Sequence, residues 1–277
     1  MRNIYIGMAT AAVALAGLVS CDDIKEQDRF IPVEREHSAK VVLLEEFTGA
    51  RCVNCPNGAA EVHKILESDE FKDNVVAVSL YPSQLTSLTA PTTVDLRTDA
   101  ASEYFSAYDG TTKGLPGAMF DRTPYNGSVI QLDVASWGTF VNQAIKDVPP
   151  LDITLSGDYD AASRKLDVTY KISFVDLVAE EVCMQLWLIE NGIVSFQYST
   201  TGLIPDYENN HVLRAAINGT WGESLGVGHT PNQIAEGSSS ITLKSDWKAE
   251  NVQVVGFVYR ASDRRVLQAH LLKSIID

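Results

Sequence analysis

Two cysteines separated by two residues stand in the stretch EEFTGARCVNCPNG, residues 45–58, where an apolar run gives way to a helical pattern. The residues before them, KVVLLEEF (40–47), are typical of a buried strand, and residues 56–68 carry apolar side chains at helical spacing. The pair is therefore expected between a strand and a helix. A pair of this kind can serve as a redox centre, as half of a metal site or as a structural disulfide.

The pattern continues in a regular order up to residue 146. Runs of β-branched residues bounded by turn signals predict strands, and apolar spacing of three and four residues predicts helices. The expected elements are the strand 40–47, the helix 56–68, the strand 74–81, the helix 94–108, the strands 117–121 and 127–132 joined by a turn at Asn126-Gly127, and a helix from Asp133 to Lys146.

This order resembles that of the thioredoxin family, whose active-site cysteines lie between the first strand and the first helix. Glu46 stands six residues before Cys52, where that family holds a buried acid, and Pro116 in KGLPGAMF matches its cis-proline. The resemblance implies an α/β thioredoxin-like domain over residues 39–148. It also implies a catalytic site of Cys52, Cys55, Glu46 and Pro116.

Each of these residues has a physical task in that site. The helix dipole and the unpaired N–H groups of a helix N-terminus stabilise a thiolate, which lowers the pKa of Cys52 from about 8.5 toward 7 or below. We therefore expect Cys52 to attack first and Cys55 to resolve the mixed disulfide, while Glu46 takes or relays a proton. Pro116 positions the partner chain and does not react.

Other interpretations of the pair remain. A zinc site lacks ligands, because the remaining cysteines, Cys21 and Cys183, fall at the N-terminus and in an expected strand. We expect no metal and no cofactor. A static disulfide stays open, since Arg51 stands where thioredoxins have tryptophan and Pro56 follows the second cysteine.

The double proline in KDVPPLD marks a boundary, beyond which strand patterns take over. Residues 151–277 are expected to form an all-β antiparallel sandwich. One long loop is expected at residues 203–226. It concentrates polar side chains that either bind a ligand or satisfy the loop backbone, namely Tyr207, Asn209, Asn210, His211 and Arg214.

The N-terminus reads as an export signal over residues 1–20, and LAGLVSC resembles a bacterial lipobox that would place a lipid on Cys21. Residues 21–38 are charged and aperiodic, as in a tether. Attachment to the membrane is expected through the lipid on Cys21 only. The formal net charge of −14 argues against nucleic acid as a partner.

The lipobox together with EEFTGARCVNCPNGA, GLPGAMFDR and NNHVLRAAINGTWGE resembles the outer-membrane lipoproteins of Bacteroidota related to the twenty-eight-kilodalton outer membrane protein. The resemblance implies a thioredoxin-like domain joined to a β-sandwich and held by a lipid at the outer membrane. Asp22 and Asp23 after Cys21 fit the export tags of surface lipoproteins in that phylum, whereas in enteric bacteria an aspartate there retains a lipoprotein at the inner membrane. The function predicted from these residues is thiol–disulfide exchange with protein thiols or disulfides. The alternative is a non-catalytic surface binding protein or adhesin with a structural disulfide, in which residues 82–113 and 203–226 carry recognition.

Overall fold

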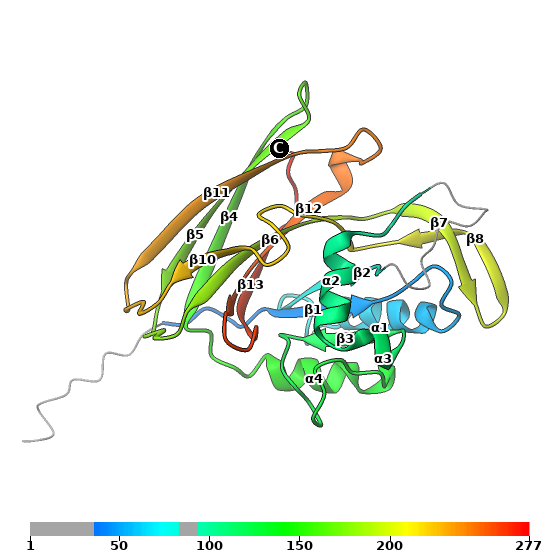
Figure 1. Cartoon of the computed structure of the whole chain (residues 1–277), viewed down its shortest axis with the longest axis horizontal. Helices are drawn as coiled ribbons and strands as arrows, with labels where there is room; N and C mark the ends of the chain where they lie inside the picture. The colour runs from blue at the N-terminus through cyan, green and yellow to red at the C-terminus, as the bar shows by residue number, and fades with distance from the viewer. Residues whose placement is uncertain (1–35, 83–93, 277) are drawn as a thin grey trace, which may run out of the picture. The chain divides into compact units, whose positions relative to one another are not determined.

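The strand β1 (Val42–Phe47) is buried over its whole length, because packed elements cover both of its faces. The computed structural model describes residues 36–82 and 94–276, which form one compact unit (Figure 1). β2 (Val75–Leu80) pairs with β1 in parallel, and β3 (Gly117–Phe120) pairs with it antiparallel. Alternate side chains of β1 therefore enter two different cores.

Helices cover both faces of this sheet. α1 (Cys55–Glu67) and α4 (Trp137–Ala144) share one core with β1, and a 3-10 turn at Val134–Ser136 precedes α4. α2 (Asp99–Ala107) enters the other core and is followed by the single turn α3 (Gly110–Lys113). The helix α2 begins at Asp99 because the side chain of Thr98 caps it.

The same sheet continues into the second half of the chain. The link is a single bridge between Ser79 of β2 and Val212 of β9, with the Ser79 N–H donating to the carbonyl of His211 at 2.8 Å. The strand order is β13-β12-β6-β9-β2-β1-β3, with β10 paired to β6. The added strands are β6 (Val182–Glu190), β9 (Val212–Ala216), β10 (Glu223–Gly226), β12 (Val252–Arg260) and β13 (Val266–Leu272).

A second, three-stranded antiparallel sheet packs against β6 and β12. Its order is β11-β5-β4, and its apolar side chains meet those of β6 and β12 in a separate core. A 3-10 turn at Ala249–Asn251 leads into β12. The strands of this sheet are β4 (Leu151–Asp160), β5 (Lys165–Phe174) and β11 (Ile234–Thr242). The sequence predicted an α/β domain followed by an all-β antiparallel sandwich. The order of α/β elements followed by antiparallel strands is confirmed, but β6, β9, β10, β12 and β13 lie in the same sheet as β1, β2 and β3.

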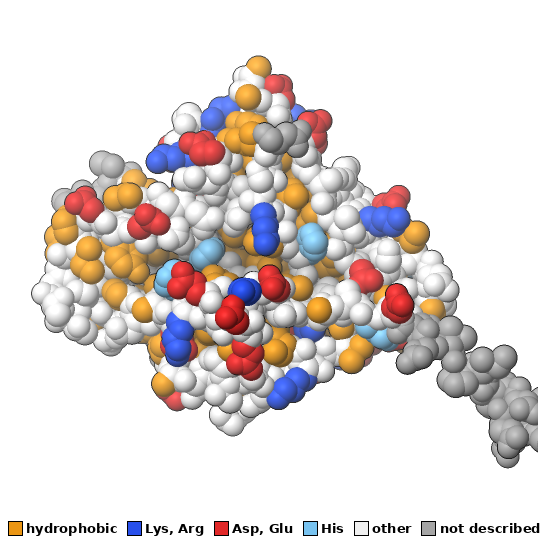
Figure 2. Space-filling model, turned by 180° about the vertical axis from the view of Figure 1, so that it is seen from behind, with side chains coloured by type: hydrophobic (Ala, Val, Ile, Leu, Met, Phe, Trp, Pro, Cys, Tyr) orange, Lys and Arg blue, Asp and Glu red, His pale blue; other side chains and the backbone are white. Residues whose placement is uncertain are grey.

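One hairpin leaves the sheets and reaches back to the first half. β7 (Ile193–Ser199) and β8 (Gly202–Asn209) pair only with each other, and Figure 1 shows them beside the start of α1. The Tyr198 N–H donates to the carbonyl of Ala50, in the loop that holds the cysteines, at 2.8 Å. Hydrophobic side chains gather at this end of the molecule in the rear view of Figure 2.

Several expectations are corrected. Residues 203–226 are not one long loop but contain β8, β9 and β10. The reason is that β8 is largely exposed to solvent, so it shows none of the apolar alternation that predicts a strand. The strand β13 was not expected, and residues 127–132 form no strand but contribute two isolated bridges, Ser128 to Tyr125 and Gln131 to Ala118.

The expected boundary before Leu151 coincides with the start of β4, yet residues on the two sides of it share one core. Independent folding of 39–148 and 151–277 stays a prediction. The signal 1–20, Cys21 and most of the tether lie outside the described residues.

Candidate functional site

Cys52 and Cys55 form a disulfide in the loop that joins β1 to α1, with Cα atoms 5.4 Å apart. The loop turns tightly, since the Cys52 N–H donates to Gly49 and the Cys55 N–H donates to the carbonyl of Cys52. Cys55 is the first residue of α1, and Pro56 follows it in the first turn, where a missing N–H costs nothing. The structure therefore places the pair at the helix start that the sequence predicted.

Pro116 lies beside this helix start, and the Leu115–Pro116 peptide bond is cis. A methyl group added at Gly58 of α1 would lie 3.1 Å from Cβ of Pro116, so glycine is what lets the two backbones approach. Pro116 and Leu132 line a shallow groove of about 330 Å³ with Asn54, the residue directly before Cys55. Pro116 thus lies at the helix start that carries the cysteine pair.

Glu46 reaches the same helix from the sheet. Its side chain is buried, and one carboxyl oxygen, Oε2, accepts a long hydrogen bond of 3.5 Å from the Ser79 hydroxyl. The other, Oε1, has no hydrogen-bond partner among the described residues. Burial raises the pKa of Glu46 to about 8, and the Ser79 bond opposes that rise only weakly. The carboxyl is therefore mostly protonated at neutral pH.

Oε1 of Glu46 points at the face of α1 that carries Cys55. A methyl group at Gly58 would lie 2.6 Å from this oxygen, and Gly58 follows Cys55 by three residues, one helical turn. Glu46 and Cys55 also line the same cavity. The arrangement places a titratable carboxyl on the same cavity as Cys55, facing the next turn of its helix.

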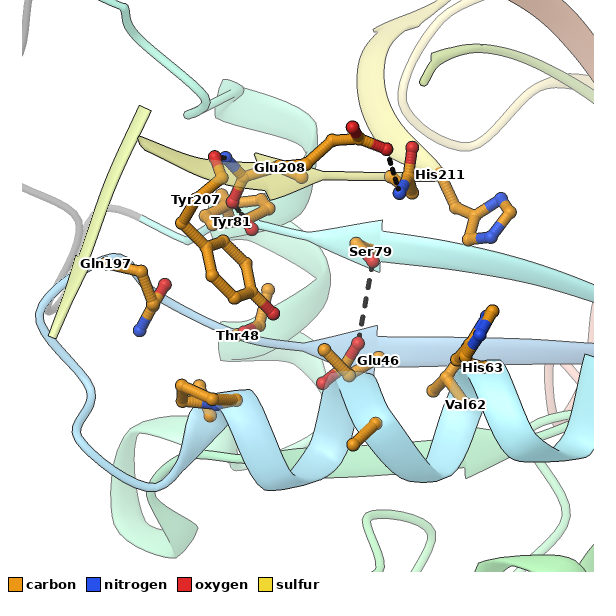
Figure 3. A pocket seen from close by; sticks show the side chains of 16 residues that line it. Glu46, Thr48, Val62, His63, Ser79, Tyr81, Gln197, Tyr207, Glu208 and His211 are labelled. Atoms are coloured by element: carbon orange, nitrogen blue, oxygen red, sulfur yellow. Dashed lines mark hydrogen bonds between the residues drawn. The ribbon is translucent and has the colours of Figure 1, made fainter. Parts of the chain in front are cut away.

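That cavity, of about 480 Å³, lies between α1 and the β7–β8 hairpin, as Figure 3 shows. The ring of Tyr207 points into it, and the Tyr81 hydroxyl donates to Asn209 at 2.8 Å on its wall. Burial lowers the pKa of His211 to about 4, so its ring is neutral at physiological pH. His63 lines the cavity as well, with its Nε2 3.2 Å from Glu67.

The polar residues expected in the loop 203–226 do not all lie at the cavity. Asn209 donates to the carbonyl of Ile193, and the side chain of Asn210 accepts from the Gly192 N–H, so both satisfy backbone as well as lining the cavity. Arg214 is elsewhere, paired with Glu190 at 3.2 Å.

The hairpin residue Gln197 is part of the site, and the sequence did not reveal it. Its amide Nε2 donates to the carbonyls of Gly49 (3.2 Å) and Cys52 (3.0 Å), so it connects the hairpin to the cysteine loop. Cys52 is 5% exposed and Cys55 1%. A lone glutamine in an otherwise strand-like run gives no signal of this contact, because the contact depends on how the hairpin folds back.

In residues 36–82 and 94–276, no group of three or more histidine, cysteine, aspartate or glutamate side chains is arranged to hold a metal ion. No helix in these ranges is long and apolar enough to cross a membrane.

Comparison with known proteins gives both structural and family relationships. HBP35 of Porphyromonas gingivalis superposes with a TM-score of 0.67 at 16% identity, over 86% of this chain and 77% of that one. A protein of Agrobacterium tumefaciens gives a TM-score of 0.51 at 13% identity, over 86% and 96%. At such identities the likeness concerns the fold alone. A domain of the outer membrane lipoprotein Omp28 from Porphyromonas gingivalis is 22% identical over 46% of this chain and 90% of that one, with a TM-score of 0.33.

No curated protein matches the chain. The model of the family described as outer membrane protein Omp28 matches residues 101–273, which is more than half of the sequence. The match includes Pro116 and the hairpin, while the cysteine pair and Glu46 precede it. It agrees with the resemblance found in the sequence and with the expected place at the outer membrane. The chain belongs to the Omp28 family of outer membrane proteins.

Proposed function

We propose that this protein exchanges thiols and disulfides with protein partners at the outer membrane, through Cys52 and Cys55, while a lipid on Cys21 anchors it. In this proposal residues 39–148 are a thioredoxin-like unit and residues 151–277 a β-sandwich attached to it. The support is the placement of a disulfide at a helix start, next to a cis-proline and above a buried acid.

The observation that carries the proposal is the carboxyl of Glu46. A buried carboxyl with an unpartnered oxygen is costly to a fold, so its presence calls for an explanation. Perturbed acids of this kind gather at functional sites, and a pKa of about 8 lets the group give or take a proton near neutral pH. Glu46 faces the helix surface of Cys55, whose thiol must lose a proton in order to react.

The exchange runs in two steps, starting from the dithiol. The thiolate of Cys52 attacks one sulfur of a partner disulfide, so that a Cys52–partner bond forms, the partner's own S–S bond breaks, and the leaving sulfur takes up a proton. The ionised fraction of Glu46 then takes the proton of Cys55, whose thiolate attacks the sulfur of Cys52. The Cys52–Cys55 bond forms, the Cys52–partner bond breaks, and the released sulfur takes up a proton, so the partner leaves as a dithiol that has gained two electrons. The reverse sequence oxidises a partner dithiol.

A second candidate function is favoured by one observation: both cysteines are buried, and the β7–β8 hairpin is hydrogen-bonded to the loop that holds them. A disulfide that no partner reaches is a structural cross-link, and the protein is then a non-catalytic binding protein or adhesin. In that case the cavity and the groove beside the disulfide carry recognition.

The deciding experiment equilibrates the folded full chain with glutathione buffers and traps free thiols at each ratio. A reversible transition of the pair in the native protein supports exchange. The Cys55→Ala variant should also accumulate a mixed disulfide between Cys52 and a peptide disulfide, because the resolving thiol is gone. Reduction of the pair only in denaturant would reject exchange and leave the structural disulfide.

A further inference from the structure

The side chain of Gln197 joins the hairpin to the cysteine loop. Besides its bonds to the carbonyls of Gly49 and Cys52, its Nε2 donates to the carbonyl of Tyr198 at 2.9 Å, and Gln197 is 2% exposed. The pairing of β7 with β8 shifts register between Ser195 and Gln197, which is the signature of a β-bulge. A bulge re-aims the side chains next to it, and here Gln197 is aimed at the loop.

The loop that holds the cysteines combines exposed and buried residues. Arg51, Val53 and Asn54 are exposed, so the loop lies at the surface, yet Cys52 between them is buried. The hairpin contacts this loop through the amide of Gln197 and through the Tyr198 N–H, which donates to the carbonyl of Ala50. A thiol can attack a disulfide only if it reaches the sulfur, so access sets the rate together with thiolate chemistry.

We propose that Gln197 is a positioning residue for the exchange: its amide holds the Cys52 loop under the β7–β8 hairpin, and release of this hold admits the partner's sulfur. The inference deepens the proposed function, on which it rests. Gln197 touches no reacting atom. It acts through the carbonyls of Gly49 and Cys52, which it fixes in place in the folded chain.

The test measures the second-order rate of reduction of the disulfide by dithiothreitol in the native full chain. Gln197→Met keeps the length of the side chain but cannot donate, so the hold is lost and the rate should rise at least about tenfold, which corresponds to the net worth of one or two hydrogen bonds. Ser199→Ala is the matched control. It removes a hydrogen bond within the same hairpin, from Ser199 to the Gly202 carbonyl at 2.8 Å, without touching the loop, and should change the rate less than about twofold.

A purely structural role would lower the melting temperature of both variants without separating their reduction rates. For a positioning residue the rates of reduction and reoxidation rise together, so the equilibrium with glutathione stays within about twofold of wild type. Equal rates in Gln197→Met and wild type, or an equal rise in Ser199→Ala, overturn the inference.

A measurement on the wild type covers the case in which the variant does not fold. The logarithm of the reduction rate is followed in sub-denaturing urea. A shallow rise indicates local opening of the hairpin and supports the inference, because the slope scales with the surface exposed. A fast rate without urea dependence rejects the hold of Gln197 but leaves exchange intact. A slope as steep as that of global unfolding rejects both.

Discussion

The guanidinium of Arg122 and the carboxylate of Glu45 form a two-pronged ion pair, with N–O distances of 2.9 Å, and neither side chain is more than 2% exposed. Glu45 precedes Glu46 on β1, and Arg122 follows β3. The aromatic rings around the guanidinium come from both halves of the chain, at 5.0 to 5.9 Å from their centroids: Tyr104, Tyr108, Trp187, Trp221, Phe257 and Tyr259. The pair thus joins the two halves.

Removing one partner of this pair should be costly. Arg122→Met leaves Glu45 buried without its partner, and we expect the free energy of unfolding to fall by about 3–5 kcal/mol in urea titrations. The double variant with Glu45→Met should recover part of that loss, because no buried charge remains. Arg265→Ala, which breaks a half-exposed pair with Asp147, is the control and should cost at most about 1 kcal/mol. Equal losses for Arg122→Met and Arg265→Ala would contradict the role assigned to the pair.

Glu46 should make stability depend on pH. Its pKa in the folded chain, about 8, lies above the ordinary 4.5, so between these values the folded state keeps a proton that the unfolded chain has lost. The stabilisation from this group is complete below pH 4.5 and is lost as pH rises through 8. The full span is on the order of 5 kcal/mol.

The measurement compares urea unfolding of wild type and Glu46→Gln from about pH 5 to pH 9, where the neutral amide should flatten the decline. The surface variant Glu67→Gln should keep the slope of the wild type, since Glu67 is exposed on α1. Parallel curves for wild type and Glu46→Gln would show that Glu46 is ionised in the folded chain throughout.

Cleavage between the halves should leave them together. Residues 146–148 are exposed, Val148 to 65%, so a protease site introduced there should be accessible. Because β9 joins β2 and the halves share a core, we expect the nicked chain to elute as one species on gel filtration and to separate only in denaturant. Two folded fragments eluting apart would instead favour the independent domains that the sequence predicted.

The reduction potential of the pair should lie nearer the reducing or isomerising end of the range known for thiol–disulfide proteins, about −270 mV to about −120 mV. Val53 and Asn54 bring no cation or imidazole that would stabilise a thiolate. Arg51 is the charge that pushes the other way, so Arg51→Ala should make the pair more reducing. Glutathione and dithiothreitol buffers give the value, and a potential near −120 mV would defeat the prediction.

The lipid anchor has a direct test. Cells grown on a labelled fatty acid should label the protein, and Cys21→Ala should remove the label. Cys183→Ala, which changes the free cysteine in β6, should keep it. Label that persists in Cys21→Ala would exclude lipidation at that residue.

Local sequence was enough to predict the strand–helix junction at Cys52, the acid at Glu46, the proline at Pro116 and the start of β4 at Leu151. Each depends on short-range chemistry: apolar periodicity, turn residues, and a family pattern carried by a few neighbouring side chains. These signals survive in the sequence because the residues that produce them are close along the chain.

The tertiary structure alone decided how the halves join and what covers the disulfide. β9 meets β2 through one bridge between Ser79 and Val212, and Gln197 grips a loop 145 residues away in sequence. Neither contact produces a periodic pattern in the sequence, because each depends on a single side chain or a single strand pairing. The strand β8 gives no apolar alternation either, since it is largely exposed to solvent. Local patterns determine which segments become strands and helices. Which distant residues meet is determined by the burial of the apolar surfaces that these segments leave exposed.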